Sequence, residues 1–335
     1  MDTPLDPSLA AIVDASRQRG TVPPFSGTPS QARERLRVAV MAMRQAAQPV
    51  PVACTQDRLA RHAGTTVPVR IYRPEADAAP RPTVVFFHGG GFVLGGIECM
   101  DDIARKLCRD VGAVIVSVGY RLAPEHPFPA AHDDAIAATL WAMDQVMELG
   151  GDPARVAVAG ESAGGNLAAS TAIVLQRRGR ALAAQLLVVP GVDLARDTEA
   201  LQARRSDHPM LAPADLRDIT RLYMGPRMAE AGAFPPSPLR AGSLAGLPPA
   251  VIALAGHDPL FGEGNAYASR LAEAGVPVQR LCFGDMFHPF LGFFQVSQAA
   301  RRANDSICQA FADCLGVKAP RLPPDRALRS FPRKP

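Results

Sequence analysis

Arg155-Val-Ala-Val-Ala-Gly-Glu-Ser-Ala-Gly164 places a serine between two different local patterns. Its first five residues are mostly apolar, which predicts a buried strand, and the Ala-rich stretch Ala163–Arg178 predicts a helix. A G-x-S-x-G motif in this strand–turn–helix context is typical of a nucleophilic serine, here Ser162. Gly160 and Gly164 are required because larger side chains would collide beside a serine in a strained backbone conformation. The alternative interpretation is a tight turn with a spare serine.

Similar apolar runs recur on both sides of this stretch. Five of them are mostly apolar and do not alternate, which predicts strands buried on both faces as in a parallel sheet: Thr83–Phe87, Val114–Val118, Gln185–Val189, Ala250–Ala255 and Val278–Phe283. An earlier run, Thr66–Tyr72, alternates apolar and polar residues as a half-exposed strand does. Further helices are predicted between the strands: Asp101–Val111, Ala130–Leu149, Gly264–Ala274 and Gln295–Cys314. This alternation predicts an α/β fold with a mostly parallel central sheet flanked by helices.

Two segments interrupt the alternation. Residues 1–45 have a helical period and precede the first strand. Residues 195–245 have no strand-like stretch and contain Pro-Pro-Ser-Pro at 235–238. We predict that both segments form one helical cap over the functional edge of a catalytic core made of residues 46–194 and 246–315. Residues 316–335 are predicted to form a flexible, basic, Pro-rich tail.

His88-Gly89-Gly90-Gly91-Phe92 directly follows one of the predicted strands. Glycines let backbone N–H groups face a cavity, where they can stabilise negative charge that develops on a carbonyl oxygen. We predict an oxyanion hole formed by the N–H groups of Gly89, Gly90 and Ala163, with His88 holding the loop. A phosphate-binding loop is not indicated, because no G-K-[ST] follows and the spacing is not G-x-G-x-x-G. A glycine-rich turn without a ligand is the remaining alternative.

A nucleophilic serine also needs a base and an acid, and in α/β hydrolases these follow the serine as Asp or Glu and then His. His288 falls in a loop between the last predicted strand and the last predicted helix, so we predict it as the general base. Asp258 follows the strand ending at Ala255, at the edge where open sheets build their sites. Asp285, three residues before His288, is the rival acid. Asp258 is favoured because an acid on a separate loop can orient the imidazole from behind.

The composition limits the classes of binding partner that can be expected. At 335 residues, with 47% hydrophobic and 20% charged residues, the chain can bury a sizeable core. Its net charge is +4, yet residues 316–335 alone carry six basic residues and one acidic residue, which leaves 30 basic and 31 acidic residues elsewhere. We therefore expect no nucleic-acid partner for the folded body, and electrostatic capture by the tail is the less favoured alternative.

The sequence also predicts the compartment. The start, Met1-Asp-Thr-Pro-Leu-Asp6, lacks the basic and apolar regions of a secretory signal. No apolar run reaches the roughly 18 residues that span a bilayer. Six cysteines occur without a C-x-x-C pair or a metal-like spacing: Cys54, Cys99, Cys108, Cys282, Cys308 and Cys314. We expect a cytoplasmic protein with free thiols, no membrane contact and no bound metal.

Taken together, the motifs resemble those of the bacterial hormone-sensitive-lipase-like carboxylesterases, often called family IV. The resemblance is carried by H-G-G-G-F, by Y-R-L-A-P-E-H-P-F-P-A-A at Tyr120–Ala131, by G-E-S-A-G, by D-P-L and by the late histidine. It runs from about residue 55 to 315 in order and at matching spacing. The start, Leu5-Asp-Pro-Ser-Leu-Ala10, is also similar to the cap of that family.

The resemblance implies an α/β-hydrolase fold with a helical cap and hydrolysis of carboxylic esters with short to medium acyl chains. It implies no cofactor, a small-molecule ester as the ligand, and commonly a homodimer formed near the last strand and helix. Carried over residue by residue, the catalytic residues of the family fall on Ser162, Asp258 and His288. Its oxyanion donors fall on the N–H groups predicted above, and Tyr120–Glu125 falls on a structural turn.

Three positions depart from the family pattern. Glu161 stands in place of the usual Asp, Pro289 in place of the Gly after the catalytic His, and Phe261-Gly262 in place of Arg-Asp. We expect them to affect substrate preference and rate more than the class of reaction. Two other functions stay open: a non-catalytic protein that binds a small molecule, and an amidase, lactonase or carbamate hydrolase that uses the same residues.

Overall fold

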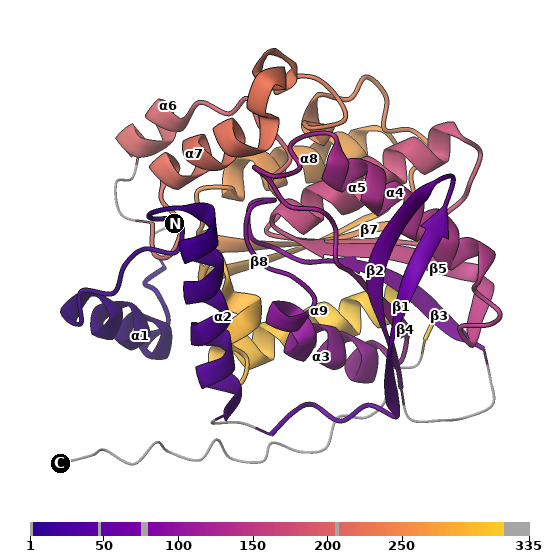
Figure 1. Ribbon diagram of the computed structural model, residues 1–335, viewed down its shortest axis with the longest axis horizontal. Coiled ribbons are helices and arrows are strands. Elements are labelled where there is room, and N and C mark those ends of the chain that lie inside the picture. The colour runs from indigo at the N-terminus through magenta and orange to yellow at the C-terminus, as the bar shows by residue number, and fades with distance from the viewer. Residues whose placement is uncertain (1–2, 46–47, 75–79, 205–207, 318–335) are drawn as a thin grey trace.

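One eight-stranded sheet runs through the computed structural model, which describes residues 3–45, 48–74, 80–204 and 208–317 (Figure 1). In sequence order the strands are β1 (Cys54–His62), β2 (Thr65–Arg73), β3 (Arg81–Phe87), β4 (Val114–Val118), β5 (Gly151–Glu161), β6 (Gln185–Val188), β7 (Ala250–His257) and β8 (Val278–Phe287). Their order across the sheet is β1-β2-β4-β3-β5-β6-β7-β8. β2 is antiparallel to both of its neighbours. The other strands, β4-β3-β5-β6-β7-β8 in their order across the sheet, are parallel to one another. The predicted α/β fold with a mostly parallel sheet is confirmed.

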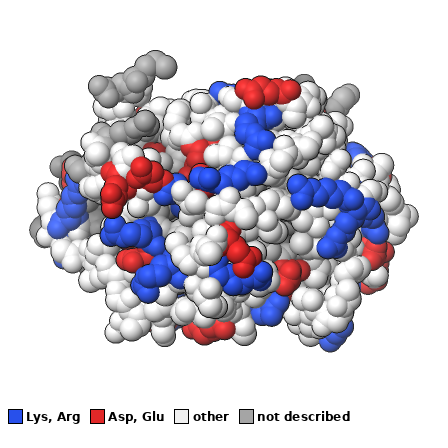
Figure 2. Space-filling model, turned by 90° about the horizontal axis from the view of Figure 1, so that it is seen from above, with Lys and Arg blue, Asp and Glu red and all other residues white. Residues whose placement is uncertain are grey.

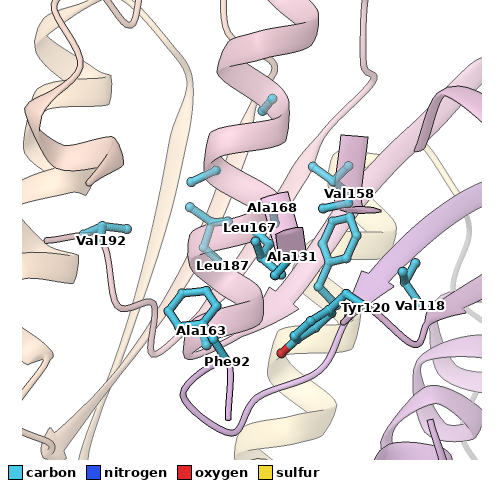
Figure 3. Packing of buried hydrophobic residues seen from close by; sticks show 14 of the residues in the cluster. Phe92, Val118, Tyr120, Ala131, Val158, Ala163, Leu167, Ala168, Leu187 and Val192 are labelled. Carbon is cyan, nitrogen blue, oxygen red and sulfur yellow. The ribbon is translucent and has the colours of Figure 1, made fainter. Parts of the chain in front are cut away.

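Helices cover both faces of this sheet (Figure 1). They are α1 (Pro7–Gln18), α2 (Pro29–Gln45), α3 (Asp101–Val111), α4 (Ala130–Asp144), α5 (Ala163–Arg177), α6 (Thr198–Arg204), α7 (Pro213–Met224), α8 (Phe261–Glu273) and α9 (Gln298–Cys314). Side chains of α4, α5 and α8 share one buried cluster with Val85 and Phe87 of β3, and part of this cluster is drawn in Figure 3. Side chains of α3 and α9 share the other cluster with Val84 and Phe86. The alternation along β3 explains why a strand buried on both faces is apolar throughout.

The two edge strands differ from the sequence predictions. β1 was not predicted, and Ala60 is its only buried residue, because an edge strand with little buried surface needs no hydrophobic pattern. β8 was predicted to be covered on both faces, which is wrong for most of its length. Gln279, Arg280 and Cys282 are exposed, and β8 is an edge strand that pairs with β7 alone in the described sheet.

Several helix ends also differ. α4 ends at Asp144, and the chain from 145 to 150 forms turns that close at Gly150, whose φ is +81°. α8 begins at Phe261, earlier than predicted. α9 begins at Gln298 because the hydroxyl of Ser297 accepts the N–H of Ala300 (3.2 Å) and so caps the helix.

In Figure 1, α1 and α2 lie on the left and α6 and α7 at the upper left. α2 donates from Arg33 to the main-chain oxygen of Val93, in the loop after β3. α7 places Ile219 beside Gly91 of the same loop. α1 lies farther along the sheet, where the N–H of Asp6 donates to a main-chain oxygen of β8 (2.9 Å). The predicted tail lies outside the described residues apart from 316 and 317.

Candidate active site

Ser162 occupies a sharp turn between β5 and α5. Its φ of 56° and ψ of −116° lie in a region that non-glycine residues rarely adopt. A Cβ atom added to Gly160 would lie 2.0 Å from the main-chain oxygen of Gly164, and one added to Gly164 would lie 2.0 Å from the main-chain oxygen of Phe87. Only glycine fits at either position, so the motif serves to bring the half-buried serine to the tip of the turn.

His288 and Asp258 meet Ser162 at this turn. His288 directly follows β8, and its Nε2 lies 2.8 Å from Oγ of Ser162. Its Nδ1 lies 2.8 Å from Oδ2 of Asp258, which directly follows β7. With the imidazole proton on Nδ1, the histidine donates to the carboxylate and accepts from the serine hydroxyl. Three residues separated by up to 126 positions thus form one hydrogen-bonded chain at the carboxyl ends of parallel strands.

The rival acid Asp285 and the neighbouring His257 are held elsewhere. Asp285 lies within β8, and its main-chain oxygen accepts the N–H of Asp6. His257 ends β7, and its Nε2 lies 2.9 Å from the main-chain oxygen of Thr3. The carboxylate that contacts the imidazole of His288 is therefore that of Asp258, which lies on the separate loop after β7.

The carboxylate of Asp258 is fixed on its second side as well. Oδ1 accepts the N–H of Leu260 (2.9 Å), and the main-chain oxygen of Asp258 accepts the N–H of Phe261 (3.2 Å), the first residue of α8. The start of α8 therefore orients Asp258, which is 4% exposed. This arrangement leaves Oδ2 directed at the histidine.

Charges around His288 determine its protonation. Burial lowers the pKa of its imidazole, but the charge and hydrogen bond of Asp258 and the charges of Glu161 and Glu263 outweigh that effect. The pKa of His288 therefore lies above its ordinary value. Burial raises the pKa of Glu161 to about 7, a shift that the positive charge of His288 opposes. Glu161 and His288 consequently influence one another close to neutral pH.

The loop His88–Leu94, here called the glycine loop, follows β3. Gly90 has a φ of +117°, and a Cβ atom there would lie 2.3 Å from the main-chain oxygen of Leu94. The main-chain oxygen of Gly90 accepts the N–H groups of Val93 (3.1 Å) and Leu94 (2.8 Å). Within the described part of the chain, no main-chain oxygen accepts a hydrogen bond from the N–H groups of Gly89 and Gly90. They are available to a ligand, as the predicted oxyanion hole requires.

His88 supports the glycine loop from within. It is fully buried, and its Nδ1 donates to the main-chain oxygen of Gly89 (2.7 Å). Tyr120 stacks on its ring with 4.1 Å between the ring centroids, and the hydroxyl of Tyr120 donates to the main-chain oxygen of His88 (2.8 Å). Burial lowers the pKa of His88 to about 4, so the imidazole stays neutral near pH 7. These contacts fit the structural role predicted for both residues.

One buried ion pair near the site was missed from the sequence. Arg196 donates through Nε to Glu263 (2.7 Å), and their side chains are 7% and 8% exposed. Glu263 also accepts the N–H of Asp193 (3.2 Å), so the pair joins the loop after β6 to α8. Nothing local to Arg196 in the sequence indicates that its partner is Glu263, 67 positions away.

The departures from the family pattern are accommodated. Pro289 precedes a short 3-10 turn, Phe290–Phe293, and the histidine before it still reaches the serine. Phe261 begins α8, and Gly262 has open space beside it, since a Cβ there would meet no atom within 4 Å. The change from Arg-Asp to Phe-Gly thus removes two charges from the start of α8 and leaves Asp258 in place.

The described residues also bear on metal binding and on membrane crossing. Among them, no group of three or more His, Cys, Asp or Glu residues could hold a metal ion, and no helix is long and apolar enough to cross a membrane. All six cysteines are free thiols. Seen from above, basic side chains are interspersed with acidic ones on the visible face (Figure 2).

Comparison with known proteins places the chain in a family. A family model described as an alpha/beta hydrolase fold matches residues 84–292. Esterase LipI of Mycobacterium tuberculosis is 41% identical over 70% of this chain and 74% of its own length, and carboxylesterase NlhH of the same species is 36% identical over 89% and 92%. The chain belongs to the hormone-sensitive-lipase-like α/β hydrolases. A hyperthermophilic esterase from the archaeon Pyrobaculum calidifontis superposes on this α/β hydrolase with a TM-score of 0.86, at 35% identity over 93% of this chain and 99% of that one. The resemblance stated from the motifs is confirmed.

Proposed function

We propose that this α/β hydrolase is a serine carboxylesterase for esters with short to medium acyl chains. The observation that carries the proposal is the hydrogen-bonded chain from Ser162 through His288 to Asp258. The same arrangement of nucleophile, base and acid performs acyl transfer on several unrelated folds. The names of its relatives, esterase and carboxylesterase, support the same class of reaction.

The reaction proceeds in two halves. Ser162 attacks the ester carbonyl carbon while Nε2 of His288 takes the hydroxyl proton, and Asp258 stabilises the imidazolium. The N–H groups of Gly89, Gly90 and Ala163 bind the negative carbonyl oxygen. The intermediate then expels the alcohol, which receives the proton from the imidazolium, and leaves the acyl group on the serine. Water, deprotonated by the same histidine, attacks the acyl carbon, and the released serine regains its proton.

The segments 1–45 and 195–245 act as the cap of this site in our proposal. Contacts of α2 and α7 with the glycine loop support it, because both helices then border the space above Ser162. We also propose that two copies pair through β8, whose outer edge has no partner strand in the described sheet. The free thiols fit a reducing compartment, which favours the cytoplasm.

A series of p-nitrophenyl esters from acetate to palmitate tests the substrate class, together with labelling by a fluorophosphonate probe. We expect labelling at Ser162 and the highest kcat/KM at acetate to octanoate, with at least a tenfold loss at palmitate. The corresponding p-nitroanilides separate an amidase from an esterase. A protein that is not labelled and hydrolyses no ester would be a binding module, and the proposal would be wrong.

Glu161→Gln should shift the acid limb of the pH profile. His288 acts as a base only when neutral, so kcat/KM rises with pH through the pKa of His288. Removing the negative charge of Glu161 lowers that pKa, and we expect the acid limb to move to lower pH. Glu34→Gln, at an exposed carboxylate of α2, serves as the control. An unchanged limb in the Glu161 variant, measured from pH 5 to 9, would show that this carboxyl does not act on the base.

A further inference from the structure

The glycine loop is held between two helices that belong to the proposed cap. On one side α7 contributes Ile219, whose Cδ1 would lie 2.8 Å from a Cβ added to Gly91. Tyr223 of the same helix stacks on Phe92 with 3.9 Å between the ring centroids. These contacts are apolar and fill space, so they restrain the loop without fixing the direction of any N–H group.

On the other side α2 contributes one polar side chain, Arg33. Its Nε donates to the main-chain oxygen of Val93 (2.7 Å), and its Nη2 donates to that of Ala123 (2.7 Å). Nη1 and Nη2 also form a two-point ion pair with Glu125, at 2.8 and 2.7 Å. The rigid fork of a guanidinium therefore joins α2 to two loops at once. The N–H of Ala123 in turn donates to the main-chain oxygen of Phe92 (2.9 Å), so the two loops are also joined to each other.

This contact continues to the proposed oxyanion donors in two steps. Arg33 fixes the main-chain oxygen of Val93, and the N–H of Val93 donates to the main-chain oxygen of Gly90. The N–H of Gly90 is one of the groups available to a ligand. Hydrogen bonds from a charged donor are stronger than neutral ones, so the orientation of Val93 is well defined while Arg33 is in place. The hydrogen bond from the guanidinium of Arg33 lowers the pKa of Glu125 to about 2.

We propose that Arg33 is a positioning residue that holds the oxyanion hole in its active geometry through Val93 and Gly90. The proposal rests on the proposed ester hydrolysis, in which the N–H of Gly90 stabilises the transition state. It gives the cap a second task besides covering the site. Displacement of α2 would loosen the oxyanion donors, so the site would be fully active only when the cap is seated.

The test compares Arg33→Met with Arg37→Met. Arg37 lies one turn further along α2, and its ion pair is made with Glu34 of the same helix. With p-nitrophenyl butyrate we expect Arg33→Met to lower kcat at least tenfold, with KM changed less than threefold, because ground-state binding does not depend on the oxyanion donors. Arg37→Met should keep both constants within twofold. Hydrogen–deuterium exchange should become faster at residues 89–94 in Arg33→Met and stay unchanged in Arg37→Met.

Glu125→Gln separates positioning from general stabilisation. It removes the charge of the partner and leaves Arg33 free to donate to Val93 and Ala123, so we expect a smaller loss of kcat than for Arg33→Met. Equal losses in the two variants, or an unchanged kcat in Arg33→Met, would overturn the proposal. If the wild-type protein hydrolyses no ester, the proposed function is wrong. Hydrogen–deuterium exchange at residues 89–94 then tests the role of Arg33 by itself. Unchanged exchange in Arg33→Met overturns that role, and faster exchange supports it.

Discussion

Ser162→Ala is expected to lower kcat for p-nitrophenyl butyrate by about 10⁴-fold or more. The methyl group that replaces the hydroxyl cannot attack a carbonyl carbon. It also offers no proton to Nε2 of His288, which lies 2.8 Å from Oγ of Ser162 in the wild-type protein. What remains is catalysis by the N–H donors and by binding alone. The variant should also fail to react with a fluorophosphonate, which forms its bond to the serine oxygen. Stopped-time assays at high enzyme concentration measure the residual rate.

Ser170→Ala is the matched control for this result. Ser170 lies two turns further along α5, is buried to the same degree as the core, and donates its hydroxyl to the main-chain oxygen of Pro235 (2.7 Å). Its loss should cost about 1 kcal/mol of stability and leave kcat within threefold. If Ser162→Ala retained more than one hundredth of the wild-type rate after repeated purification, the nucleophile would have to lie elsewhere.

The parts of the site that could be predicted from the sequence are those governed by short-range backbone constraints. The turn at Ser162 needs glycine two residues before and after it, since a Cβ at Gly160 or Gly164 would overlap a main-chain oxygen. Such a constraint leaves a recognisable motif. His288 and Asp258 could be placed because each follows a predicted strand, and the carboxyl ends of parallel strands meet at one edge. The fold and the family were predicted from local patterns of the same kind, and both predictions are confirmed.

The parts that could not be predicted depend on partners far away in the chain. Arg33 and Glu125 are separated by 92 positions, and Arg196 and Glu263 by 67, and neither arginine has a local pattern that selects its partner. The edge strand β1 escaped prediction because its side chains are mostly exposed and carry no hydrophobic period. In contrast, the apolar residues of β8 suggested two covered faces, although the strand has an open edge. A local sequence pattern predicts the burial of side chains reliably only where those side chains are almost completely buried.

Asp258→Asn should have the second-largest effect, a loss of about 10⁴-fold in kcat. The amide keeps the size of the side chain, so Leu260 can still donate to its oxygen and α8 keeps its start. The amide carries no negative charge, and its NH₂ group can face Nδ1 and stabilise the wrong tautomer of His288. The pKa of His288 should fall once the charge of Asp258 is removed, so the acid limb of kcat/KM should move to lower pH.

Asp285→Asn distinguishes the two acids that the sequence left in competition. Asp285 is only three residues from His288, but its place within β8 puts its main chain against Asp6, and the hydrogen bond to Nδ1 comes from Asp258. We therefore expect Asp285→Asn to keep kcat within threefold. A larger loss for Asp285→Asn than for Asp258→Asn would transfer the role of the acid to Asp285. Because both substitutions exchange one carboxylate for an amide, a difference between them of three orders of magnitude reflects position and not the loss of charge alone.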